Sequence, residues 1–249
     1  MSDAQDPSPA RAAPPPTVHG YDEELEGLRN LVGEMGGLAE AQVVAAVDAL
    51  VRRDAEAGLA VAAGDEALDR LEAEAERMAI GIIARRAPVA QDLRELVAAL
   101  KISAILERIG DYAKNIGKRA CSIAHASPVQ PVVIIPEMAR LVAAMVRDAL
   151  DSYVTRDADL AAEIMSRDTR IDDFYNSLFR SLLTYMMENP HHITQAAHLL
   201  FIAKNLERIG DHATNIAEMV HFQVTGERGP ERPKADATPL FAGDKRGEP

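Results

Sequence analysis

Two eleven-residue segments, one hundred residues apart, carry the same acidic pattern. LERIGDYAKNI spans Leu106–Ile116, LERIGDHATNI spans Leu206–Ile216, and nine of the eleven positions are identical. Each segment spaces two acids and an asparagine four residues apart, so in a helix the three side chains follow one stripe. Such a row of oxygen atoms is suited to binding a cation. The predicted ligands are Glu107, Asp111 and Asn115 in the first copy and Glu207, Asp211 and Asn215 in the second.

A second pair of acids precedes each stripe at the same four-residue spacing. The pairs are Asp65 with Asp69, and Asp168 with Asp172. If the pairs and the stripes lie on neighbouring antiparallel helices, their carboxylates converge on one or more cations with oxygen ligands only. Such ligation favours Mg²⁺, Mn²⁺ or Ca²⁺, and carboxylate clusters also hold iron and Zn²⁺. The pattern therefore predicts a metal site in each half, without choosing the metal.

Other roles for these acids stay open. Arg108 and Arg208 are adjacent in sequence and can neutralise the acids by ion pairing, which would leave a purely helical scaffold. A carboxylate-bridged metal hydrolase or a di-iron redox enzyme is a further alternative, because such ligands can activate water. Gly110 and Gly210 lack a Cβ, so we expect another helix backbone to approach closely there. Asp54 and Asp157 stand at predicted helix starts, and we interpret them as N-caps.

Charge and composition restrict the classes of function. The chain of 249 residues has a formal net charge of −12, whereas nucleic-acid binding depends on cationic contact with phosphates. The same charge disfavours broad docking on anionic lipid. No apolar run approaches the roughly 20 residues needed to span a bilayer, and the N-terminus lacks the pattern of a secretion signal. We therefore predict a cytoplasmic protein that meets membranes only through partners.

Motifs of nucleophilic catalysis are missing from the sequence. It contains no Gly-rich phosphate loop and no G-x-S-x-G, and Cys121 is its one cysteine. Without a nucleophile and a base at a recognisable spacing, we predict that the protein is not an enzyme.

The elements that must position the acids are helices. Ala, Leu, Glu, Arg and Met dominate the body of the chain and strand-like runs are scarce, so we predict an all-α fold. Breaks at Gly, Pro and Asp positions divide it into two halves of similar length, each a three-helix bundle. The predicted helices span about 22–53, 54–86 and 90–124, then 137–155, 157–188 and 191–223. The predicted units are a disordered tail (1–20), a first repeat (21–126), a linker (127–136), a second repeat (137–224) and a disordered tail (225–249).

The segments Ile82–Ile116 and Leu178–Val220 closely resemble the PhoU family, accessory regulators of the bacterial phosphate-specific transport system. The resemblance implies two three-helix bundles related by internal pseudo-symmetry, each with a multinuclear metal site built from the paired acids. It also implies a negative regulator of the phosphate-starvation response, acting from the cytoplasmic face and often as a homodimer. The implied partners are the phosphate sensor histidine kinase and the ATPase subunit of the phosphate ABC transporter.

Overall fold

The described residues of this computed structural model, 16–126, 133–167, 169–227 and 229, form helices, turns and connections without a strand. The first half contains α1 (Pro16–Arg52), α2 (Ala55–Ala63), α3 (Asp65–Arg86) and α4 (Ala90–Ile123). The second half contains α5 (Ile134–Thr155), α6 (Ala158–Ser166), α7 (Thr169–Glu188), the short 3₁₀ helix η2 (Pro190–His192) and α8 (Ile193–Thr225). The predicted all-α fold is confirmed, and the second predicted helix of each half is divided in two.

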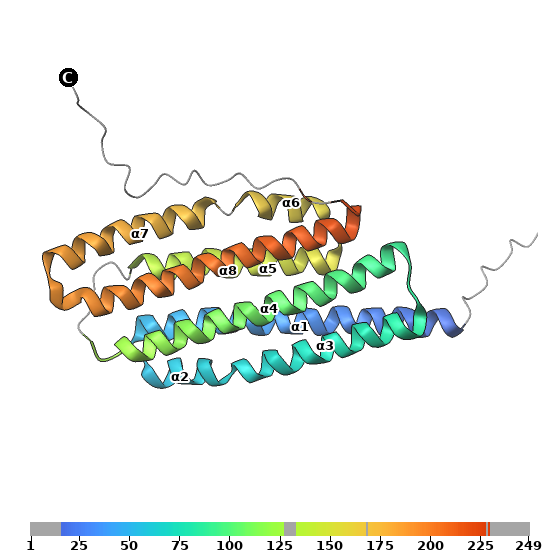
Figure 1. Ribbon diagram of the computed structural model, residues 1–249, viewed down its shortest axis with the longest axis horizontal. Helices are drawn as coiled ribbons and strands as arrows, with labels where there is room; N and C mark the ends of the chain where they lie inside the picture. Colours follow the sequence, from blue (N-terminus) through green and yellow to red (C-terminus); the bar gives the residue numbers. More distant parts are fainter. Residues whose placement is uncertain (1–15, 127–132, 168, 228, 230–249) are drawn as a thin grey trace, which may run out of the picture.

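The two halves are helical bundles that lie side by side. They pack against each other through their long helices, α1 and α4 of the first half and α5 and α8 of the second. In Figure 1, α4 and α8 run antiparallel next to each other on the near face, with α1 and α5 behind them. The pair α2 and α3 covers one side of this four-helix centre, and the pair α6 and α7 covers the opposite side (Figure 1). The acidic stripes are therefore carried by the two helices at the centre of the molecule, and each central helix has an outer helix beside it.

Aspartate side chains begin the interrupted helices in both halves. The Asp54 carboxylate accepts a hydrogen bond from the Ala57 amide (2.9 Å), and the Asp157 carboxylate accepts one from the Leu160 amide (2.9 Å). Each caps the first turn of its helix, α2 or α6, where backbone N–H groups have no partner within the helix. The interpretation of these two residues as N-caps is confirmed.

Two helices begin earlier than the sequence pattern predicts. Helix α1 starts at Pro16, within the predicted tail 1–20. Proline suits the first turn of a helix because the backbone N–H that it lacks would have no partner within the helix there. Helix α5 starts at Ile134, within the predicted linker 127–136, and the side chain of Ile135 is fully buried. Burial of that side chain favours a helix at the end of the run VVII (132–135), although β-branched residues between two prolines do not predict one. Residues 1–15, 127–132 and 230–249 lie outside the described part of the chain.

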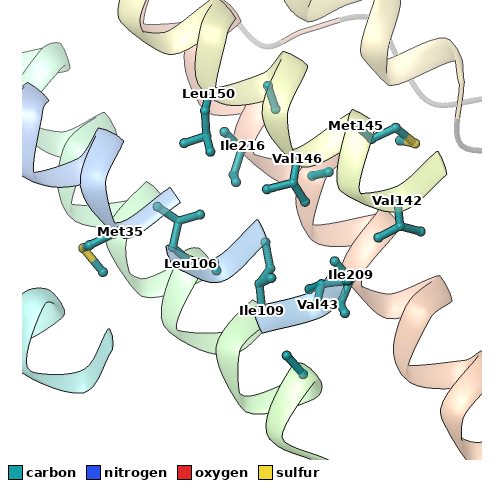
Figure 2. Packing of buried hydrophobic residues seen from close by; sticks show 14 of the residues in the cluster. Met35, Val43, Leu106, Ile109, Val142, Met145, Val146, Leu150, Ile209 and Ile216 are labelled. Atoms are coloured by element: carbon teal, nitrogen blue, oxygen red, sulfur yellow. The ribbon is translucent and has the colours of Figure 1, made fainter. Parts of the chain in front are cut away.

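One hydrophobic core runs through both halves. Figure 2 shows side chains of α1 and α4 meeting those of α5 and α8, including Leu106, Ile109, Val146 and Ile209. Gly36 of α1 lies so near α5 that a Cβ there would overlap the side chain of Leu150. The repeats are consequently fused across a packed interface rather than joined only by a linker.

A buried acid adds a polar tie between the halves. Glu95 of α4 is 3% exposed, and its carboxylate accepts hydrogen bonds from Arg29 of α1 (2.5 Å) and from Arg156 at the end of α5. Because an isolated buried carboxylate is costly, the two guanidinium groups hold α1, α4 and α5 in one arrangement.

Among the described helices, none is long and apolar enough to cross a membrane.

Candidate metal centre

The first acidic group is formed where α3 begins beside the middle of α4. Asp65 is the first residue of α3 and is 4% exposed. One of its carboxylate oxygens accepts a hydrogen bond from the Lys114 ammonium group of α4, and Lys114 also lies 3.4 Å from the Asp111 carboxylate. The structure therefore brings Asp65 and Asp111, acids predicted from different helices, onto one positive charge.

The pKa of the Glu107 carboxyl group is affected by all the acids of this group. Its burial raises its pKa above the ordinary value, and the charges of Asp111, Asp69, Asp65 and Glu72 raise the pKa further. Four acids that raise the pKa of a fifth make a strongly negative cluster between α3 and α4, with Lys114 as its counter-ion. Such a concentration of charge favours the binding of an additional cation.

Two buried oxygen atoms in this group have no hydrogen-bond partner among the described residues. They are Oδ1 of Asp65 and Oε1 of Gln42. Both face Gly110 of α4: a Cβ at Gly110 would lie 3.5 Å from the first atom and 3.3 Å from the second, and would overlap the side chain of Leu68. Two acceptors that face one small space without a donor are the arrangement that a cation satisfies. Carboxylate and amide oxygens are the type of ligand that hard cations prefer, and the metal site itself stays a prediction.

Gln42 joins the first acidic group although it belongs to no acidic motif of the sequence. It lies on α1, is 7% exposed, and its amide nitrogen donates a hydrogen bond to the carbonyl of Gly64 (3.0 Å). That bond fixes the amide next to the start of α3. The sequence could have indicated this role, because Gln42 stands among core-facing positions such as Ala39 and Ala46. A buried polar side chain at such a position needs a partner.

The second acidic group lies between α7 and α8. Burial raises the pKa of Glu207, and the charges of Asp211 and Asp172 raise it further, against the opposing effect of a hydrogen bond from Lys204. The Lys204 ammonium donates to one Glu207 oxygen at 2.7 Å, while the other oxygen, Oε2, is buried without a partner among the described residues. Asp172 also has a raised pKa, first through burial and then through Asp211. The fourth predicted member, Asp168, lies outside the described residues.

The two asparagines of the stripes differ from the acids in their surroundings. Asn115 is exposed, and Asn215 lines a groove between α4 and α8, with its amide 3.4 Å from the His212 ring. Each four-residue step rotates the side chain by about 40° around the helix, so the third member of a stripe turns away from the outer helix. The acids are therefore the stronger candidates for ligands than Asn115 and Asn215.

The described side chains do not form a finished metal cage. Within the described ranges, no group of three or more His, Cys, Asp or Glu side chains stands ready to hold a metal ion. In the first group the ammonium of Lys114 already occupies the space between Asp65 and Asp111. A metal ion placed between Asp65 and Asp111 would therefore have to displace the Lys114 ammonium group.

The expected close approach of helix backbones occurs away from Gly110. A Cβ at Gly117 of α4 would lie 2.7 Å from the backbone oxygen of Gly58 in α2, and the reverse also holds. At Gly110 the neighbouring group is instead the side chain of Leu68. Two glycines facing each other allow the backbone of α2 to lie directly against that of α4.

Comparison with known proteins identifies the family. The family model described as the PhoU domain matches twice, over residues 32–120 and 135–220. The chain is 53% identical over 222 residues to a phosphate-specific transport system accessory protein PhoU homolog of Caulobacter vibrioides, which covers 88% of this chain and 96% of the relative. A homolog of the same description from Zymomonas mobilis is 51% identical over 216 residues, or 87% of this chain and 91% of the relative.

Solved structures share the architecture. The crystal structure of PhoU from Pseudomonas aeruginosa has a TM-score of 0.80 at 37% identity, covering 83% of this chain and all of that one. The regulatory protein PhoU from Streptococcus pneumoniae has a TM-score of 0.79 at 25% identity, covering 85% of this chain and all of that one. The double match to the family model also confirms two tandem repeats. With both repeats matched and relatives of more than 50% identity along almost their whole length, this chain belongs to the PhoU family.

Proposed function

We propose that this protein is a metal-binding regulatory adaptor of phosphate transport. In this role it represses the phosphate-starvation response and limits phosphate uptake when phosphate is abundant. It acts in the cytoplasm as a homodimer and links the ATPase subunit of the phosphate ABC transporter to the sensor histidine kinase. The observation that carries the proposal is the identity of about half of all residues to relatives named as accessory proteins of phosphate-specific transport.

The two acidic groups would hold the metal ions. In the first half the ligands are Asp65, Asp69, Glu107 and Asp111, with Gln42 supplying a further oxygen. In the second half they are Asp172, Glu207 and Asp211, together with Asp168. All are oxygen donors, which suits Mg²⁺, Mn²⁺, iron or Zn²⁺. A bound multivalent cation would join an outer helix to a central helix by neutralising acids on both.

Occupancy of each metal site would then change how the surrounding helices pack. Asp65 begins α3 and Glu107 and Asp111 lie on α4, so a change at this group bears on the packing of α3 against α4. In the absence of another cation, Lys114 and Lys204 neutralise part of the negative charge of the two acidic groups. Because α4 and α8 also pack against each other, the two groups act on the same central pair of helices. The adaptor works by altered contacts and not by turnover.

The metal part of the proposal is tested by metal content. Glu107→Ala combined with Asp111→Ala removes two acids from α4, and we expect the purified protein to lose the metal of the first half by elemental analysis. Glu74→Ala combined with Glu76→Ala is the matched control, because both acids are exposed on α3. Unchanged metal content in the first variant, with native helicity, would reject the first site.

The regulatory part is tested in the host. Deletion of the gene should release alkaline phosphatase expression in high phosphate, and the wild-type chain supplied in trans should restore repression. Repression that persists in the deletion strain would contradict the regulatory role. Hydrolysis of phosphoesters or reduction of oxygen by the metal-loaded protein would instead support the alternative of a carboxylate-bridged metal enzyme.

A further inference from the structure

A groove of about 440 Å³ lies between α1 and α5, which Figure 1 shows behind the central pair α4 and α8. It lies apart from the acidic groups, which form where α3 meets α4 and where α7 meets α8. We call it the rear groove. Its α1 wall contains Val44, Val47, Asp48 and Val51, and its α5 wall contains Arg140, Ala144 and Arg147.

The α1 wall belongs to a long uncharged surface of that helix. From position 37 to position 51, every solvent-exposed position of α1 holds glycine, alanine or valine: Gly37, Ala41, Val44, Ala45 and Val51. Val44 is 49% exposed and Val51 is 47% exposed. Together with Asp48, this apolar row follows alternate steps of four and three residues, the spacing of a seam on which a second helix packs. Single exposed apolar side chains are ordinary, but a continuous row along one helix indicates a contact surface.

The α5 wall is basic, although it is the counterpart of the α1 wall in the repeat. Counted back from the caps Asp54 and Asp157, Arg140 and Arg147 hold the places that Gly37 and Val44 hold in the first half. Both arginine side chains are exposed. The two walls of the rear groove are therefore equivalent in position and different in chemistry.

Opposite charges stand near the same level of the rear groove, on its two walls. Gly36 of α1 meets Leu150 of α5, and the two helices run in opposite directions (Figure 1). Asp48, further along α1, therefore lies near the level of Arg140. Within the chain each of them pairs along its own helix, Asp48 with Arg52 and Arg140 with Glu137. Exposed pairs of this kind contribute little, so they do not prevent new partners.

We propose that the rear groove is an interface between two copies of this chain, in which α1 of each copy lies along α5 of the other. A two-fold axis along the groove places the apolar row of α1 over the α5 wall of the second copy, and places Asp48 beside the partner's Arg140. Because the contact is isologous, both pairings occur twice. A face that carries an apolar row, an acid and the arginine that matches it is complementary to itself, and this identifies a second copy as the occupant.

The charge of the whole chain does not oppose contact at this face. The net charge is −12, yet the charged side chains that line the rear groove are one aspartate, Asp48, and two arginines, Arg140 and Arg147. Two copies of an acidic chain therefore meet here with locally balanced charge, and the remaining charges are screened beyond about 8 Å at physiological salt. This inference deepens the homodimer of the proposed function and rests on it.

Sedimentation velocity of the full chain over a concentration series measures the dimer. Wild type should be dimeric at micromolar concentration, and Val44→Glu with Val51→Glu should weaken the dimer Kd about tenfold or more. Leu59→Glu with Ile80→Glu is the matched control, because these side chains of α2 and α3 are 56% and 53% exposed and the change of charge is the same. The control should stay within twofold of wild type. Equal loss in the control, or a wild type that is monomeric throughout, would overturn the proposal.

A charge exchange tests which helices meet. Asp48→Arg places arginine beside the partner's Arg140, and Arg140→Glu places glutamate beside the partner's Asp48, so each variant alone should dimerise more weakly than wild type. An equal mixture of the two variants restores an opposite charge at both contacts and should form a dimer as tight as wild type. Weakening of both variants without recovery in the mixture would overturn the proposed pairing of α1 with α5.

The same measurements separate this inference from the proposed function. If wild type is a dimer that neither Val44→Glu with Val51→Glu nor the charge exchange affects, the interface lies elsewhere, so the rear groove is rejected while the homodimer stands. If deletion of the gene leaves repression of alkaline phosphatase unchanged, the regulatory role fails, and sedimentation still decides whether the rear groove joins two copies.

Discussion

The ring of Tyr112 stacks on the ring of His212, with centroids 5.5 Å apart and ring planes inclined by 24°. The two residues hold the same place in the repeated segment, one hundred residues apart. A residue that touches its own counterpart must lie close to the axis that relates the repeats. The difference between the two copies of the motif, tyrosine in one and histidine in the other, is therefore located at the centre of the interface between them.

This stacked pair should contribute a measurable coupling between the repeats. In a double-mutant cycle on Tyr112→Ala and His212→Ala, we expect a coupling energy of about 0.5–1.5 kcal/mol from urea unfolding. Tyr112→Ala combined with His192→Ala provides the control, because His192 stacks on Tyr185 instead. Additive effects of Tyr112→Ala and His212→Ala would show that the stacking contributes nothing to the interface.

The facing glycines should tolerate no added carbon. Gly117→Ala places a Cβ 2.7 Å from the backbone oxygen of Gly58, and backbone cannot move aside as a flexible side chain can. We expect the free energy of unfolding to fall by about 1–3 kcal/mol, as in other overpacked cores. Gly33→Ala, where nothing lies within 4 Å of the added carbon, should stabilise α1 by about 0.5–1 kcal/mol. Destabilisation of similar size at both positions would contradict the close contact.

Most of the fold was predictable because helical signals are local. Alanine-rich periodic segments, the caps Asp54 and Asp157, and the breaks at Gly64, Pro88 and Pro190 define the helices without tertiary information. The start of α5 at Ile134 is not predictable from composition, because burial of the Ile135 side chain extends the helix into the linker. The shared core also could not be inferred, since nothing in the sequence shows that Gly36 receives Leu150 from the other repeat.

The candidate site was predictable in part. Spacing placed Glu107 and Asp111 on one stripe and the repeat supplied Asp65 as their neighbour. Lys114 and Lys204 stand at different places in the two copies, so the repeat could not reveal that each group has its own lysine. Gln42 lies outside every acidic motif and joins the first group only through the packing of α1.

The lysine of the first group should compete with metal. Lys114→Met removes the ammonium that bonds to Asp65 and Asp111, so the metal-free protein should lose about 1–3 kcal/mol of stability. Mn²⁺ should then raise the melting temperature more than it does in wild type, because no ammonium has to be displaced. Both quantities follow from thermal unfolding with chelator and with Mn²⁺. Lys118→Met, an exposed position one turn further along α4, is the control; an equal response in the two variants would contradict competition at the site.

The raised pKa of Glu107 predicts how stability depends on pH in chelator-treated protein. Folding raises this pKa from the ordinary value of 4.5, so the folded state binds more protons than the unfolded state, and stability falls as pH rises from 4.5 through the raised pKa. Glu107→Gln removes this loss. We expect the variant to be more stable than wild type at neutral pH and as stable as wild type near pH 4. Glu76→Gln, at an exposed position of α3, should show no such pH-dependent gain. A gain from Glu107→Gln that is the same at both pH values would rule out the ionised carboxylate as its cause.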